Sequence, residues 1–409
     1  MEQAPQRLKS DLAWVLLLSL SVRAAALLVV PRLYPSLFQL GETWGDCFVC
    51  IARDILEEGL GEALGLPVKP IGFPLVLAAL LKTAGGSLWP IRVFQLICGS
   101  LSCCTVYLIG LRLFDRRVAL AAGLLSSVYP FFVRQDVTLY AESLFMLLYL
   151  AAFYCIVSLI LEFKARYAWL AGLFLGLAAL VKPAPLPLIP VLTLYLASIF
   201  RSSWHKVIQV IVGVAAVPAV FLAPWTLRNA ALGYGLRMSD SLDGITFYYG
   251  NSPFAEHYYF EGVDVRELYG DRWKEQLNLT ADETDSAYYY GKAFEYIRLY
   301  PTKALRLFAA KIGAFWRMWP YHNVSPLTVA GYSAVPPLGL FGLLLFLRRL
   351  PSVGLLIVVT FALFTVFFSI YFVEIRYRIP VIDPFLVLFA ASVPFSVRTG
   401  SVRDSRVGL

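Results

Sequence analysis

The chain has 409 residues, of which 59% are hydrophobic and only 15% are charged. Soluble domains usually carry about 25% charged residues, so this composition excludes a water-soluble enzyme and, because apolar residues are abundant, a disordered protein. The formal net charge is +8, but the basic residues are scattered between apolar runs, which argues against a nucleic-acid partner. The sequence therefore indicates an all-α polytopic membrane protein surrounded by membrane lipids.

Ten segments meet or approach the roughly 17–25 mostly apolar residues that a membrane-spanning helix needs. They are 12–31, 89–113, 117–134, 139–162, 167–181, 185–200, 205–225, 327–347, 352–373 and 377–396. We therefore expect a bundle of about ten transmembrane helices. No small-residue cleavage site follows the first segment, so we expect it to be retained rather than removed as a signal peptide.

The short loops predict the orientation of these helices, because Lys and Arg concentrate on the cytoplasmic side. With the N-terminus inside, all the remaining inside segments are basic: 115–117, 164–166, 201–206, 348–349 and the tail after 397. The stretches 32–88, 134–140 and 226–326 then fall outside. Within them, 71–84 is short and 303–319 carries four basic residues. We expect both to lie in the membrane interface as amphipathic helices.

This pattern divides the chain into three parts. Residues 1–225 form a transmembrane module that includes the first outer loop, 32–88. Residues 226–326 form an outer loop or lid with one interfacial helix. Residues 327–409 add three transmembrane helices and a basic cytoplasmic tail.

Charged residues at the outer ends of the spans are functional candidates, because charges there are costly unless they face a cavity or a partner. Asp46 begins an amphipathic stretch, 46–59, where its carboxylate could cap a helix or act as a base or metal ligand. Cys47 and Cys50 have the spacing of a metal or redox pair, but no second pair exists, so we assign them no such role. Lys69 lies in a Pro- and Gly-rich segment, where it suits a lipid-linked phosphate or a membrane headgroup.

Later outer residues extend this set. Glu142 sits about one turn inside the fourth span and is expected to face the protein interior, whereas for Asp136 a loop salt bridge with Arg134 is slightly preferred. Arg228 ends the seventh span and could anchor headgroups or a substrate. Arg376 and Arg378 lie outside, and forked guanidinium donors match phosphate well. Because the two arginines alternate across a turn, we expect one of them to face the cavity.

Together these segments resemble the GT-C superfamily of membrane glycosyltransferases, in particular the bacterial aminoarabinose transferase and protein O-mannosyltransferase branch. The resemblance rests on the order of an acidic first-loop residue, a second span bearing Arg92, and four motifs: 69–74 (KPIGFP), 140–145 (YAESLF), 224–229 (PWTLRN) and 376–380 (RYRIP). It covers about residues 10–395. It implies a GT-C-like bundle with interfacial helices over the active site in the first outer loop.

The resemblance also implies roles for single residues. Asp46 would be the general base or the ligand of a divalent metal ion, and Glu142 matches the acidic position that opens the fourth span. Lys69 and either Arg376 or Arg378 would bind the donor phosphate. Asp136, Arg228 and Arg92 are weaker candidates for substrate binding. Because Cys47 follows Asp46 where many members have a second acid, metal binding by this loop is less certain than the role of a base.

We therefore expect an inverting transferase that moves a sugar from a polyprenyl phosphate to a glycan, lipid or protein acceptor. Its site would face outward from a bacterial or archaeal cytoplasmic membrane, and the loop 226–326 would recognise the acceptor. The absence of Walker and Rossmann motifs argues against a nucleotide-sugar donor. The alternative is a lipid or glycolipid flippase without catalysis, but a transporter usually places its polar groups near the bilayer midplane.

Overall fold

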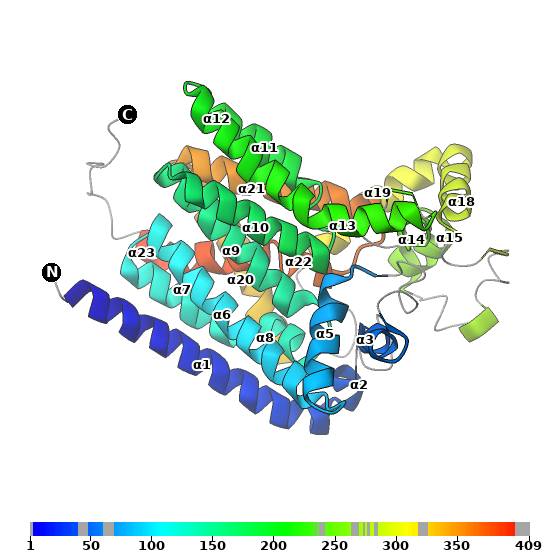
Figure 1. Cartoon of the computed structure of the whole chain (residues 1–409), viewed down its shortest axis with the longest axis horizontal. Coiled ribbons are helices and arrows are strands. Elements are labelled where there is room, and N and C mark those ends of the chain that lie inside the picture. The colour runs from blue at the N-terminus through cyan, green and yellow to red at the C-terminus, as the bar shows by residue number, and fades with distance from the viewer. Residues whose placement is uncertain are drawn as a thin grey trace.

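The computed structural model describes residues 3–39, 48–59, 69–233, 235–236, 242–262, 270–272, 275, 279–281, 285–317 and 326–396. These residues form a bundle of helices, and the described part of the chain contains no β-strand (Figure 1). The all-helical fold expected from the composition is thus confirmed.

Each of the ten predicted spans contains helix. Among the described residues, five helical stretches are long and apolar enough to cross a membrane: 6–33 in α1 (Gln3–Leu33), α6 (Trp89–Leu113), α9 (Glu142–Leu161), Trp204–Ala231 and α21 (Pro351–Ile370). A sixth follows if α7 (Arg116–Val128) and α8 (Pro130–Val137), which meet at 49°, form one broken span. Pro130 explains the break, because proline cannot donate the hydrogen bond that would continue α7.

The remaining predicted spans correspond to shorter apolar helices. These are α10 (Ala165–Val181), α11 (Leu188–Ile199), the part of α20 (Pro326–Leu347) from Ser333 on, and α23 (Asp383–Ser396). The apolar run after α10 is interrupted by prolines at 183, 185 and 187, which explains why α10 and α11 are separate and short. The helices at all ten places agree with the predicted bundle, while the number that cross the membrane stays a prediction.

The centre of the bundle is α9, which packs between α6 and α10. Its buried residues occupy all sides of the helix and include Tyr149 and Phe153, as expected for a helix that is apolar all round. The stretch Trp204–Ala231 comprises α12 (Trp204–Val210), the π-helical turn Ile211–Ala216 and α13 (Val217–Ala231). It approaches α10 so closely that a side chain at Gly172 would collide with the Gly213 carbonyl.

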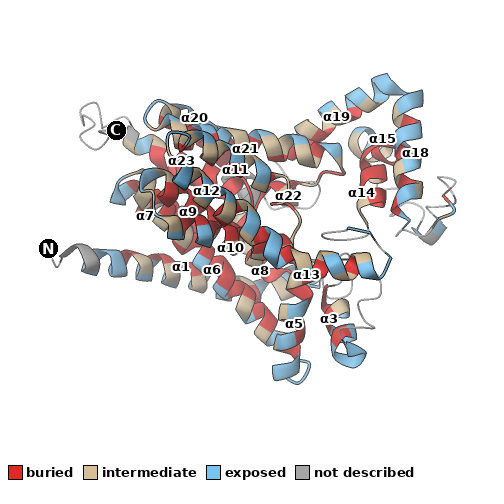
Figure 2. Ribbon diagram, turned by 45° about the horizontal axis from the view of Figure 1, so that its top comes forward, coloured by how far each residue is buried: buried red, intermediate tan, exposed pale blue. Residues whose placement is uncertain are grey.

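The described helices of the segments predicted to lie outside gather at one end of the bundle, which we call the loop end, whereas α1 begins and α23 ends at the other (Figures 1 and 2). A short helix, α2 (Pro35–Phe38), follows α1. The first predicted outer loop contributes α3 (Phe48–Glu57) and α5 (Gly72–Thr83), which pack together through an edge-to-face contact of Phe48 with Phe73, 5.4 Å between centroids. Both stretches are helical as expected, and their position in the interface stays a prediction.

The second large segment predicted to lie outside forms a subdomain with its own aromatic core. It comprises α14 (Asp243–Gly250), α15 (Pro253–Glu256), the π-helical turn η2 (His257–Glu261), α18 (Ser286–Leu299) and α19 (Pro301–Phe315). A single turn, η3 (Gly270–Arg272), lies between η2 and α18. Phe372, from the connection between α21 and α22 (Ile375–Arg378), is buried in this core with Phe254 and Tyr289. The loop-end subdomain is therefore joined to the bundle by this connection, whose Phe372 side chain packs in the subdomain's core.

Candidate active site

Two of the predicted site residues, Glu142 and Arg376, lie in one cluster of charges where α9 and α22 begin and α10 ends. Glu142 is the first residue of α9, and its carboxylate accepts a hydrogen bond of 2.8 Å from the ammonium of Lys182, directly after α10. The side chains of Glu142 and Lys182 are 4% and 20% exposed. An acid at a helix N-terminus and a base at a helix C-terminus are both favoured by the helix dipoles.

Arg376 forms the second ion pair of this cluster. Its Nε lies 2.7 Å from Glu374 Oε2, and the two side chains are 25% and 32% exposed. The Arg376 guanidinium lies over the rings of Tyr140 and Tyr377, at 5.2 Å from each centroid. On the same Tyr377 ring, at 5.5 Å, lies the Lys182 ammonium. Tyr377 therefore connects the two ion pairs, and we call Glu142, Lys182, Glu374 and Arg376 the charged cluster.

The segment that carries Lys69 abuts the end of α10 just before Lys182. Gly72 lies against the backbone of Leu180, and a Cβ there would come within 2.7 Å of the Leu180 carbonyl oxygen. Only glycine allows this approach. Lys69 is half-buried three residues before this contact, so the Lys69 segment adjoins the charged cluster.

Asp46 and Cys47 lie outside the described residues, so the predicted base stays a prediction. Phe48 is the first described residue after them, and through its contact with Phe73 it places the start of α3 beside the start of α5. Cys50, two residues further along α3, is disulfide-bonded, which the sequence analysis did not anticipate.

Arg378 has a different environment from Arg376. Both Arg378 and Asp383 are fully buried, and their ion pair measures 2.9 Å. The same guanidinium donates to the carbonyl oxygens of Phe315, at 3.1 Å, and Arg317, at 3.4 Å. Of the two arginines, Arg376 is therefore the one in the charged cluster, and Arg378 joins α22 to α23 and to the end of α19.

The expected loop salt bridge between Asp136 and Arg134 is wrong. Asp136 pairs instead with Arg23 of α1 at 2.6 Å, and neither side chain is exposed. Arg23 is one of two charged residues in the apolar part of α1 after Leu12, and a charge within a span requires a partner. This signal predicts that Arg23 has a partner but does not identify it, because Asp136 is 113 residues away.

The remaining weaker candidates also contact other parts of the protein. Arg92 is buried, donates to the carbonyl oxygens of Val137 and Phe38, at 3.0 and 3.1 Å, and lies 3.4 Å from the centroid of the Phe38 ring. It therefore joins α2, α6 and the end of α8. Arg228, on α13, is half-buried, bonds Asn229 and lies over the Trp225 ring at 5.0 Å. No contact described for either arginine reaches the charged cluster.

Lys182 and Glu374 are among the charges at the outer ends of the predicted spans, but the sequence analysis assigned no specific role to them or to Tyr377. A usable signal exists for Lys182, because Lys182-Pro183 repeats the Lys69-Pro70 dipeptide at another outer boundary. A residue before proline is held in an extended conformation, and Lys182 has φ −148° and ψ 138°. Both lysines therefore lie at points where a helix cannot continue.

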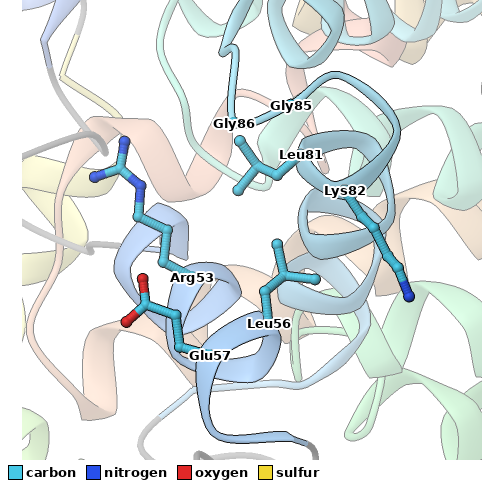
Figure 3. Close-up of a pocket in the computed structure, with 7 residues that line it drawn as sticks. All are labelled: Arg53, Leu56, Glu57, Leu81, Lys82, Gly85 and Gly86. Carbon is cyan, nitrogen blue, oxygen red and sulfur yellow. The ribbon is translucent and has the colours of Figure 1, made fainter.

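A separate surface pocket of about 300 Å³ lies between α3 and the turn after α5 (Figure 3). It contains none of the predicted site residues and lies at the opposite end of α5 from Lys69. In Figure 3 the Lys82 side chain points away from Arg53 and Glu57. Its lining residues are Arg53, Leu56, Glu57, Leu81, Lys82, Gly85 and Gly86.

No group of three or more His, Cys, Asp or Glu residues suited to a metal ion occurs in the described part of the chain. The residue predicted to bind a divalent ion, Asp46, is outside that part. A metal site that uses Asp46 therefore stays a prediction.

Comparison with known proteins identifies the fold. Residues 68–226 match a family model described as dolichyl-phosphate-mannose-protein mannosyltransferase, whereas no curated protein matches the chain. Among solved structures, the chain is similar to the archaeal oligosaccharyltransferase AglB from Archaeoglobus fulgidus in complex with an inhibitory peptide and a dolichol-phosphate. That match has a TM-score of 0.55 and 14% identity, and covers 97% of this chain and 52% of that one.

Two further structures of the Archaeoglobus fulgidus oligosaccharyltransferase are similar. One is tethered to an acceptor peptide containing the NVT sequon (TM-score 0.52, 16% identity, 95% of this chain and 49% of that one). The other is a complex with Zn and sulfate (TM-score 0.56, 15% identity, 95% and 49%). The chain spans about half the length of these proteins. Because the match extends over nearly all of this chain, the resemblance to the GT-C membrane glycosyltransferases is confirmed, and the chain has their fold.

Proposed function

We propose that the protein transfers a sugar from a polyprenyl phosphate to an acceptor at the extracytoplasmic face of the membrane. The observation that carries the proposal is the charged cluster, in which Lys182 and Arg376 lie beside the segment of Lys69. Three basic side chains in one partly exposed region suit a phosphate attached to a lipid. The dolichol-phosphate bound by the similar AglB structure agrees with this ligand class.

The ion pairs of the cluster are suited to exchanging partners. Arg376 and Glu374 are each about one quarter to one third exposed, so a phosphate could replace the carboxylate without leaving a buried charge unpaired. Buried pairs such as Arg378 and Asp383 lack this freedom, because removal of one partner leaves the other charge in an apolar environment. The donor phosphate therefore binds Arg376, Lys182 and Lys69 in our proposal.

The chemistry needs two contributions from the protein. The bond between the anomeric carbon and the phosphate oxygen breaks, and the three basic side chains stabilise the negative charge of the departing polyprenyl phosphate. A carboxylate removes the proton from the acceptor nucleophile as its new bond to the anomeric carbon forms. Asp46 is the proposed base, and Glu142 orients Lys182 through their hydrogen bond. A single displacement of this kind inverts the anomeric configuration.

A divalent ion would fit the proposal if Asp46 binds it, because positive charge beside the phosphate would add to that of Arg376. The complex of a similar structure with Zn is consistent with a metal ion in this fold.

Two observations support the outward orientation of the site. All the predicted outer segments with described helices lie at the loop end, away from the start of α1 and the end of α23 (Figure 1). Cys50 of the first outer loop is disulfide-bonded, and disulfides persist in oxidising compartments outside the cytoplasm. We infer a bacterial or archaeal cytoplasmic membrane with the loop end outside.

Binding of polyprenyl phosphate to the purified protein in lipid nanodiscs tests the proposal. We expect Lys182→Met and Arg376→Met each to weaken binding about ten- to a hundredfold, because a charged hydrogen bond contributes about 1.5–3 kcal/mol. Lys292→Met is the matched control: Lys292 pairs with Glu295 on α18, where both side chains are exposed. Unchanged affinity in both folded cluster variants would overturn the assignment of the site.

A further inference from the structure

The lysine of α19 that is expected to face the membrane surface is completely buried. Lys311 is 0% exposed, although the sequence analysis counts it among the charges that keep residues 303–319 in the interface. Its ammonium donates to Gly250 O at 2.8 Å, Asn251 Oδ1 at 3.0 Å and Ile370 O at 3.4 Å. All three acceptors are neutral oxygens. Burial of a cation against neutral partners is costly, so the position requires an explanation.

The three acceptors belong to the ends of two helices. Gly250 is the last residue of α14 and Asn251 follows it, while Ile370 is the last residue of α21. Carbonyl groups at helix C-termini lack intrahelical donors and carry partial negative charge, so they attract a cation. Asn251 adds a direct link, because its Nδ2 also donates to Ile370 O at 2.8 Å. Lys311 therefore joins α19, α14 and α21 at one point.

The chain that leaves this point leads directly to the charged cluster. Phe372 is buried in the aromatic core of the loop-end subdomain, with its ring 4.7 Å from Tyr258 between centroids. The Val373 N–H donates to Tyr259 Oη at 2.6 Å, and that hydroxyl donates to Val373 O at 3.0 Å. Glu374 and Arg376 follow. Residues 371–373 are thus held by the subdomain immediately before the cluster begins.

We propose that Lys311 is a positioning residue that holds residues 371–373 and thereby places Arg376 in the charged cluster. Tyr259 holds the same segment from the other side. Because Lys311 and Tyr259 belong to the loop-end subdomain, a movement of that subdomain is transmitted to Arg376. The proposal couples the region expected to recognise the acceptor to the residue proposed to bind the donor phosphate, and its catalytic consequence rests on the proposed function.

Hydrogen–deuterium exchange tests the coupling without any assay of activity. In Lys311→Met we expect the backbone amides of residues 371–376 to exchange at least tenfold faster, while those of α6 and α9 keep their rates. Lys292→Met is again the control for the loss of one lysine. Faster exchange confined to α19, with residues 371–376 unchanged, would show that Lys311 stabilises only its own helix and would overturn the proposal.

Tyr259→Phe keeps the test decisive if Lys311→Met does not fold. This variant removes only the hydroxyl that bonds Val373, and the ring remains to fill the core. We expect the same local increase in exchange at residues 371–376. Unchanged exchange there in folded Tyr259→Phe would contradict the proposed control of this segment by the subdomain.

Binding of polyprenyl phosphate then separates this proposal from the proposed function. If Lys311 acts through Arg376, Lys311→Met weakens binding, and the double variant with Arg376→Met binds no worse than Arg376→Met alone. If the losses of affinity of the two single variants multiply in the double variant, Lys311 does not act through Arg376 and the proposal is refuted. If the parent does not bind polyprenyl phosphate at all, the proposed function fails while the exchange result at residues 371–376 still decides the coupling.

Discussion

Arg376 and Arg378 are two residues apart, and the structure predicts opposite consequences of removing them. Arg378→Met leaves the buried carboxylate of Asp383 with Tyr129 as its remaining described hydrogen-bond donor, at 3.0 Å. Breaking a buried ion pair typically costs about 3–5 kcal/mol. Arg376→Met removes a partly exposed pair, and such pairs contribute about 0–1 kcal/mol.

Thermal unfolding of the purified variants in one detergent measures this difference. We expect Arg376→Met to unfold close to the parent and Arg378→Met to unfold well below it or to accumulate poorly. The double variant Arg378→Met with Asp383→Leu should recover much of the loss, since replacing both members of a buried pair by apolar residues is often neutral or stabilising.

Binding of polyprenyl phosphate should show the reverse order. Arg376→Met should lose binding, whereas the double variant Arg378→Met with Asp383→Leu should keep it. A stable Arg378→Met protein that binds polyprenyl phosphate weakly, beside an Arg376→Met protein that binds normally, would refute the assignment of the two arginines.

Three other predictions concern the base, the buried lysine and the orientation. Asp46→Asn should reduce turnover by about 10²–10⁴. If Asp46 is the base, this loss is the same with and without a metal chelator, and activity within about twofold of the parent would exclude that role. Burial lowers the pKa of Lys311 to about 7 from its ordinary 10.5. Between pH 7 and pH 10.5, exposing the Lys311 amine to water lets it bind a proton, so this opening becomes less favourable as the pH rises. Hydrogen–deuterium exchange at residues 371–376, corrected for intrinsic rates, should therefore slow from pH 7 to pH 9 in the parent. An equal slowing in Lys311→Met would show that the effect does not come from Lys311. Tags at residues 45 and 270 should be accessible from outside intact cells and a tag at 165 should not, and the opposite labelling would invert the topology.

Much of the fold could be predicted from the sequence, because long apolar runs specify helices locally. All ten predicted spans contain helix. The helix lengths could not be predicted as well, because breaks such as Tyr129–Pro130 and the prolines after α10 depend on single residues inside apolar runs.

The candidate site could be predicted only in part, because its contacts join distant parts of the chain. Glu142 and Arg376 stand out locally as charges at the outer ends of spans, but the link between them passes through Lys182 and Tyr377. The choice between Arg376 and Arg378 depends on burial beside Asp383, which a local pattern of alternating arginines does not contain. The partner of Asp136 was mispredicted for the same reason, since Arg23 is remote in sequence and adjacent in space.

Release of free polyprenyl phosphate tests the central claim most directly. The purified protein would be reconstituted in liposomes with a polyprenyl phosphate that carries a labelled sugar, and a membrane extract would supply acceptors on the face of the loop end. We predict that the label moves to an acceptor and that polyprenyl phosphate is released, at least tenfold more slowly by Arg376→Met and at the parental rate by Lys292→Met. Movement of the intact labelled lipid between leaflets without release of polyprenyl phosphate would contradict a transferase and identify a flippase.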